Sequence, residues 1–279
     1  MKKAFQIIGI CALTCFSFYY TDKVVEGSRY KDPIMEEIVS RSSEVNVKSV
    51  NAEINDNTIR SGVSSMVVDT NKSYQKMKSL GEYNDNLLVF KEEAPVVSIK
   101  DNYDKFVVGG NSIKRNISIC FTLSDKDYIL SILDILKKNK VVANIFLDGI
   151  FIEDNPDIVK KIIKDKHYIG NLGYGGVYDN TRLKYVNSLI YRYSDYISKY
   201  CYSSNEEDLS FCSKNKMYTI KGIDIDKNYP YTSLKENLSN GIILRFSDNK
   251  ETVKDLDLML KYVKHKGYNI ENLDDLLTE

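Results

Sequence analysis

The C-terminal part of the chain, from residue 113 onward, is predicted to form an α/β fold in which strands and helices alternate. Apolar residues alternate with others at Ile117, Ile119 and Phe121, as in a half-buried strand. Residues 128–138 carry apolar side chains at helical spacing, and residues 141–147 are almost continuously apolar, as in a strand covered on both faces. Alternating elements of these two kinds are typical of layered α/β folds.

The predicted elements follow one another closely after a Gly-Gly-Asn boundary at residues 109–111. After the first strand, helix and second strand, a helix is expected to start at Asn155-Pro156, because an N-cap residue followed by proline typically opens a helix. The remaining predicted elements, in order, are a strand at 168–170, a helix over 181–199, strands at 216–220 and 241–247, and a helix over 254–266.

Residues 1–22 combine a basic start, Met1-Lys2-Lys3, with a mostly apolar run over residues 4–20. Such a segment is either a cleaved signal peptide or a single membrane anchor. Bulky aromatic residues stand at 18–20, where a signal peptidase needs small side chains, so we expect an uncleaved anchor. The expected location is the cell membrane, single-pass, with the bulk of the chain outside the cytoplasm; a cleaved signal would make the protein secreted.

Residues 23–112 are predicted to form a stalk and a small α+β leader that packs on the following domain. Asp32-Pro33 is expected to start one short helix, and Asp69 or Thr70 to cap a second helix that Gly81 ends. Short strands are expected near residues 45–50, 62–68, 87–90 and 96–99.

The charges of the chain are balanced, with 39 Lys and Arg against 39 Asp and Glu, and they are interspersed along the sequence. This composition argues against nucleic acid as a partner, because a nucleic-acid-binding domain usually carries a basic patch. Cys120 is predicted to be a core residue. Cys201 and Cys212 leave two alternatives open: a disulfide outside the cytoplasm, or two free and partly buried thiols, which we favour because nothing fixes their geometry.

The order of motifs from Ile117 to Tyr178 resembles the polysaccharide deacetylase family, also known as the NodB homology domain or carbohydrate esterase family 4. The matching stretches are I-S-I-C-F-T-L, L-D-I-L-K-K, V-V-A-N-I-F-L-D-G, N-P-D-I-V-K-K-I and K-H-Y-I-G-N. Later matches at Gly241 and Gly267 extend the resemblance over residues 113–279. It implies an irregular (β/α) barrel, preceded by the anchor and the α+β leader.

The resemblance also implies a reaction for which this chain lacks the ligands. Family members are expected to hydrolyse the N-acetyl group of a sugar with a divalent metal that one Asp and two His hold. Leu123, Leu172 and Gly176 stand at these three positions, and none of their side chains offers a lone pair. His167 matches a histidine of the family that is not a ligand, and His265 is expected to be a solvated surface residue.

The groups expected to assist the metal are replaced as well. Thr122 stands at the position of the general-base Asp. Ser203 lies in the stretch that replaces an orienting arginine, and Phe246 or Ser247 stands where a histidine would act as the general acid. We therefore interpret Thr122, Leu123, Ser203 and Phe246 as remnant positions of a lost active site.

Three functions remain open. The preferred one is an inactive deacetylase-fold protein, without a cofactor, that binds cell-envelope glycan (peptidoglycan) or an envelope protein. The alternative is an active polysaccharide N-deacetylase that uses Zn, Co or Mn and substitute carboxylates, for which the candidates are Asp125, Asp127, Asp148 and Asp179. All four suit helix caps and turns, which is why we prefer the inactive interpretation. A scaffold that docks through residues 45–112 is the third.

Overall fold

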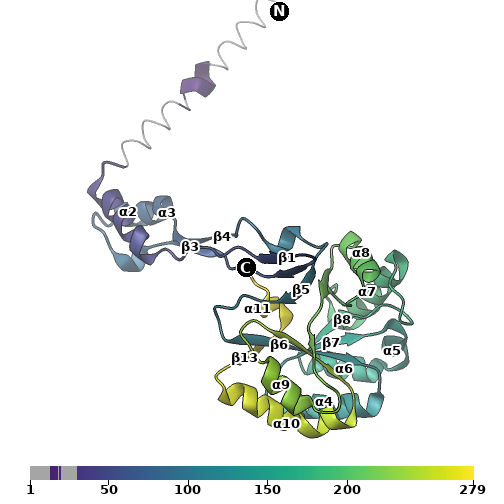
Figure 1. The fold of residues 1–279 in the computed structure, drawn as a ribbon. Helices are drawn as coiled ribbons and strands as arrows, with labels where there is room; N and C mark the ends of the chain where they lie inside the picture. The colour runs from purple at the N-terminus through teal and green to yellow at the C-terminus, as the bar shows by residue number, and fades with distance from the viewer. Residues whose placement is uncertain (1–12, 18, 20–29) are drawn as a thin grey trace, which may run out of the picture. The chain divides into compact units, whose positions relative to one another are not determined.

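The computed structural model describes residues 13–17, 19 and 30–279 (Figure 1). These residues form two compact units: the described residues up to 49 together with residues 64–93, and residues 50–63 together with residues 94–279. Most of the predicted anchor over residues 4–20 lies outside the described residues. Within the part of the chain that the structure describes, no helix is both long and apolar enough to cross a membrane.

The first unit combines helices with an antiparallel pair of strands. Asp32 caps its first helix, because the Asp32 carboxylate accepts hydrogen bonds from Ile34 N at 2.9 Å and from Tyr74 Oη at 2.7 Å. The elements are α2 (Pro33–Val45), β3 (Ser65–Val68), α3 (Thr70–Lys78), η1 (Asp85–Leu87) and β4 (Phe90–Glu93). They enclose a core of their own: Met35, Ile38, Val68, Tyr74 and Met77. The helix starts predicted at Asp32 and Asp69 are confirmed.

The second unit is organised around a mostly parallel sheet that curls into a half-barrel (Figure 1). This confirms the α/β barrel type predicted from the sequence. Across the sheet, the strands are β1 (Glu53–Asn55), β2 (Thr58–Arg60), β5 (Phe106–Gly109), β10 (Tyr218–Ile220), β9 (Tyr200–Tyr202), β8 (Tyr168–Asn171), β7 (Asn144–Leu147), β6 (Asn116–Leu123), β12 (Ile243–Ser247) and β11 (Ile223–Asp224), and β13 (Asn269–Glu271) also pairs with β6.

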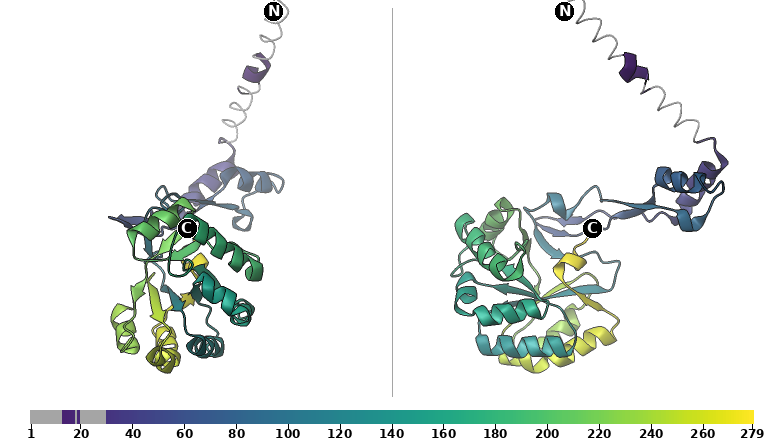
Figure 2. Two further views of the ribbon diagram at one scale, coloured as in Figure 1. Left: turned by 90° about the vertical axis from the view of Figure 1, so that its right-hand side faces the viewer. Right: turned by 180° about the vertical axis from the view of Figure 1, so that it is seen from behind.

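Helices cover the convex face of this sheet (Figure 2). They are α4 (Lys126–Lys138), α5 (Gly149–Asp154), α6 (Pro156–Lys164), α7 (Asn180–Ser194), α8 (Glu206–Lys214), α9 (Pro230–Asn237) and α10 (Lys250–His265). Phe121 and Leu123 of β6 belong to the core beneath the helices, whereas Cys120 belongs to a second core on the concave face. The turn η2 (Ile99–Asp101) and the helix α11 (Leu273–Leu276) close that second core.

The N-terminal leader is distributed over both units. Residues 50–63, which carry β1 and β2, pair with β5 of the second unit, whereas residues 64–93 belong to the first. Residues 96–99, predicted as a strand, instead lead into η2, because Ser98 accepts a hydrogen bond from Lys100 N and caps that turn.

A disulfide joins Cys201 of β9 to Cys212 of α8. The expectation of two free thiols is therefore wrong. Strand β9 and helix α8 bring the two Cα atoms to 6.4 Å, and both side chains are buried beside Met217. Sequence spacing alone does not reveal this approach. Cys120 is a free and buried thiol, as predicted, and burial raises its pKa.

Candidate functional site

The carboxyl ends of β6, β9, β11 and β12 bring a hydrogen-bonded polar cluster together. At its centre, Arg245 Nη1 donates to Thr122 Oγ1 at 3.1 Å and to Ser247 Oγ at 3.2 Å. Arg245 Nε donates to Asp224 Oδ1 at 2.5 Å, and Tyr202 Oη donates to the same oxygen at 3.2 Å. We call these five residues the arginine cluster.

Strand pairing explains why these side chains meet. Strand β12 runs parallel to β6 with Arg245 opposite Cys120 and Ser247 opposite Thr122. Side chains alternate between the two faces of a sheet, so Arg245, Ser247 and Thr122 share the concave face with Cys120. The carboxyl ends of parallel strands are also where α/β folds usually bind their ligands.

The cluster pairs one positive with one negative charge. Hydrogen bonding to Arg245 lowers the pKa of Asp224, and the same bond raises the pKa of Arg245. The Arg245 side chain is 23% exposed and the Asp224 side chain is 64% exposed, so the pair is reachable from solvent. The guanidinium also lies over the Tyr202 ring, 5.8 Å from its centroid, and burial raises the pKa of this tyrosine.

The three positions expected to hold metal ligands are distributed over different parts of the fold. Leu123 lies in the core beneath the helices, on the convex face of the sheet. Leu172 packs against the core on the concave face. Gly176 adopts a left-handed φ of 72°, and its backbone N donates to Asp148 Oδ2 at 2.9 Å.

These residues do not fit a divalent metal. Thr122 Oγ1, the side-chain oxygen at the expected base position, accepts a hydrogen bond from a guanidinium. A fixed positive charge at this distance opposes the entry of a second cation. Among residues 13–17, 19 and 30–279, no three His, Cys, Asp or Glu side chains are grouped as a metal site would require.

The other two remnant positions have structural contacts. Ser203 Oγ donates to Asp208 Oδ2 at 2.6 Å and accepts from Asn205 N at 3.0 Å, at the start of α8. Phe246 is buried against Phe121 on the convex face, with 5.5 Å between the ring centroids. Ser247, the other candidate for the acid position, lies in the arginine cluster.

The four candidate substitute carboxylates lie at helix starts. Asp125, Asp148 and Asp179 accept backbone hydrogen bonds as the N-caps of α4, α5 and α7, respectively. Asp179 also pairs with Arg182 at 2.8 Å, and Asp127 lies in the first turn of α4. None of the four belongs to the arginine cluster. Apart from the hydrogen bond that Asp148 accepts from Gly176 N, their positions and contacts are those of residues at helix starts.

Arg245 and Asp224 are not foreseen from the sequence. The signal that could have found Arg245 is its place as a single charge within the apolar run Ile242–Phe246, because a charge in a buried strand needs a partner.

Asp248 is also not foreseen from the sequence. Its carboxylate accepts hydrogen bonds from the backbone N atoms of Ser124 and Asp125, and thereby joins the ends of β12 and β6.

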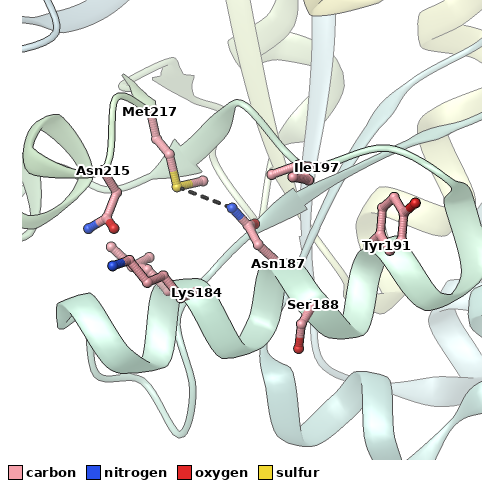
Figure 3. A pocket seen from close by; sticks show the side chains of 8 residues that line it. Lys184, Asn187, Ser188, Tyr191, Ile197, Asn215 and Met217 are labelled. Carbon is pink, nitrogen blue, oxygen red and sulfur yellow. Dashed lines mark hydrogen bonds between the residues drawn. The ribbon is translucent and has the colours of Figure 1, made fainter.

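A separate hollow of about 390 Å³ lies along α7 (Figure 3). It is mainly apolar and is lined by Leu183, Lys184, Asn187, Ser188, Tyr191, Ile197, Asn215 and Met217. The Asn187 amide donates to Ser198 O at 3.2 Å and to the Met217 sulfur at 3.6 Å. The hollow therefore offers few free polar groups, and it lacks the acid–base pairs that catalysis needs.

Comparison with known proteins gives the fold a family context. Residues 109–205 match the family model described as polysaccharide deacetylase. The resemblance to this family that the sequence indicates is confirmed over these residues. The chain is 26% identical to the uncharacterized protein YlxY of Bacillus subtilis over 272 residues, which cover 89% of this chain and 85% of YlxY.

Of two further proteins similar to this chain, one is named as an enzyme and the other as a pseudoenzyme. The chain is 25% identical to PdaA of Bacillus subtilis, a peptidoglycan-N-acetylmuramic acid deacetylase, over 65% of this chain and 78% of PdaA. It also resembles the crystal structure of a CE4 family pseudoenzyme from Bacillus anthracis, with a TM-score of 0.68 and 24% identity over 89% of this chain and 96% of that chain. The structural likeness supports the deacetylase fold.

Proposed function

We propose that this chain is a catalytically silent deacetylase-fold protein that binds cell-envelope glycan, with peptidoglycan as its ligand. The observation that carries the proposal is the hydrogen bond from Arg245 to Thr122. The guanidinium contacts Thr122, which stands at the position where a deacetylase would need a carboxylate base beside a metal-bound water. The hydroxyl of Thr122 is too weak a base to activate water, and Leu123, Leu172 and Gly176 supply no ligand.

The sugar-binding role is argued from the fold and from the place of the polar groups. The arginine cluster lies at the carboxyl ends of the strands and is open to solvent. PdaA, whose name describes an enzyme acting on peptidoglycan, is similar over most of its length. These two observations support glycan as the ligand, and the resemblance to a pseudoenzyme supports the loss of catalysis.

The proposal includes a location outside the cytoplasm and function without a metal cofactor. The basic start and the apolar run over residues 4–20 support a membrane-held protein. The Cys201–Cys212 disulfide supports an oxidising compartment, because such bonds are rare in the cytosol.

Acetate release and peptidoglycan retention together test this function. Purified protein is incubated with N-acetylglucosamine oligomers and with peptidoglycan, each with added zinc, cobalt or manganese, and PdaA serves as the active control on peptidoglycan. We expect no acetate above the protein-free blank, together with retention on sedimented peptidoglycan. Acetate released at a rate comparable to that of PdaA would contradict the silent site, and a protein that stays in the supernatant would contradict glycan binding.

A further inference from the structure

We infer that the arginine cluster is a metal-independent binding site for a neutral sugar ring, recognised through two neighbouring ring substituents. One substituent accepts a hydrogen bond from Arg245 Nη2, and the other donates to Asp224 Oδ2. The inference rests on the proposed function, because it assigns the residues and the chemistry by which the glycan is held.

The first argument is the set of hydrogen-bonding groups left free in the cluster. Among the described residues, Arg245 Nη2 has no hydrogen-bond partner, and it is accessible to solvent. Thr122 Oγ1 and Ser247 Oγ accept from Arg245, so their own hydrogens remain free to donate. Within residues 30–279, Asp224 Oδ2 has no hydrogen-bond partner, because both bonds to this carboxylate end on Oδ1. Donors and an acceptor therefore lie side by side.

The second argument is charge. Arg245 and Asp224 cancel each other, and the carboxylates of Asp248 and Asp125 lie at the adjoining ends of β12 and β6. An anionic ligand would meet these carboxylates, and a cationic ligand would meet the guanidinium. A neutral ring with one accepting and one donating substituent avoids both penalties. In N-acetylglucosamine, the acetamido N–H and the neighbouring hydroxyl form such a pair.

The third argument is the aromatic support beneath the charged pair. The Tyr202 ring lies under the guanidinium and makes an edge contact with Phe146, with 5.4 Å between the ring centroids. The Tyr202 hydroxyl is held by Asp224, so the orientation of this ring is fixed by the same pair that would bind the substituents. The ring therefore supports the guanidinium that would bind the first substituent.

Titration calorimetry with chitotetraose in the presence of EDTA tests the inference. The wild-type protein is expected to bind, because no metal is needed. Arg245→Gln and Asp224→Asn are each expected to weaken binding by about tenfold or more, since one charge-assisted hydrogen bond contributes about 1.5–3 kcal/mol. Arg245→Lys keeps the charge but loses the planar fork, so it is expected to weaken binding as well. Arg192→Gln and Asp104→Asn change exposed residues outside the cluster and serve as matched controls.

The outcomes separate this inference from the proposed function. Wild-type protein that fails to bind chitotetraose, or cluster variants that bind it as well as wild type does, would overturn the inference while peptidoglycan retention could still hold. Tighter binding of a deacetylated, cationic oligomer or of an anionic muramic acid oligomer would overturn it too. Circular dichroism checks the fold of each variant. If Arg245→Gln does not fold, Asp224→Asn decides the outcome, because its side chain is largely exposed.

Discussion

Along β12, successive side chains lie on opposite faces of the sheet. Phe246 packs beneath the helices, whereas Arg245 and Ser247 lie on the concave face with Thr122. A period of two residues is enough to predict that the side chains of 245 and 247 share a face. The partner of Arg245, Asp224, comes from a different strand, β11, and sequence alone does not reveal that pairing. The shared face of residues 245 and 247 was thus predictable, but the partner of Arg245 was not.

His167 is expected to make the protein sensitive to acid. Burial lowers its pKa from 6.5 to about 4, and its Nδ1 accepts a hydrogen bond from Ala143 N, which needs the neutral ring. The unfolded chain takes up the proton first, so the stability that the neutral ring contributes is present above pH 6.5 and is lost as the pH falls toward 4. This loss amounts to about 3 kcal/mol at about pH 4.

Urea unfolding of wild type and of His167→Gln at about pH 7 and about pH 4 checks this expectation. The free energy of unfolding of the variant should fall less between the two conditions than that of wild type. His265→Gln is the matched control, because His265 is exposed and should leave the difference unchanged. An equal loss in wild type and in His167→Gln would show that other groups dominate the acid sensitivity.

Helix ends account for much of the charge pattern of the second unit. Helices α4, α6, α8 and α10 each have an acidic residue in the first turn and a basic residue in the last turn. Acidic groups near a helix N-terminus and basic groups near a C-terminus stabilise the helix through its dipole. The sequence predicted Asp125 as an N-cap and Asp179 as a turn residue, and both carboxylates accept cap hydrogen bonds.

The disulfide between β9 and α8 is expected to stabilise the protein measurably. Cys201 and Cys212 are 11 residues apart, and closing a loop of this size contributes about 3 kcal/mol by restricting the unfolded chain. The double variant C201A/C212A should lose about that much free energy of unfolding. A reductant should lower the stability of wild type and leave the double variant unchanged.

Thiol counting provides an independent check of the disulfide. The chain has five cysteines, so denatured protein prepared without a reductant should show three reactive thiols if the bond forms. Five reactive thiols would contradict the disulfide. A wild-type stability that does not respond to the reductant would contradict its contribution to folding.

The alternation of strands and helices after residue 113 was predictable because each element carries its own period of apolar residues. The division into two units was not. Residues 50–63 join the second unit by pairing β2 with β5, whereas the residues before and after them belong to the first. Such pairing depends on backbone hydrogen bonds between segments far apart in sequence, and these leave little trace in a local pattern.

Limited proteolysis should identify where the chain passes between the units. The chain leaves the first unit and enters the second at residues 93–94. Val96 follows closely and is 91% exposed. Elastase, which cleaves after small aliphatic residues, is expected to make its earliest cut within residues 30–279 after Val96. The two fragments should remain together on gel filtration, because β2 on the first fragment pairs with β5 on the second.

Denaturing gels and mass spectrometry of the elastase fragments check the site of cleavage. Val96→Glu should slow this cut without changing gel filtration of the intact protein. Separation of the fragments under native conditions would contradict the pairing of β2 with β5. An earlier cut inside α4 or α10 would show that these helices open more readily than the passage between the units.

The guanidinium of Arg245 sets the order in which a deacetylase could be rebuilt on this scaffold. Adding ligands by Leu172→His and Gly176→His would leave the guanidinium beside position 122, and Thr122→Asp would form an ion pair with it before any base could act. Leu123→Asp would place a carboxylate in the core beneath the helices. Engineering would therefore have to begin on β12, by vacating position 245, and only then turn to the ligands.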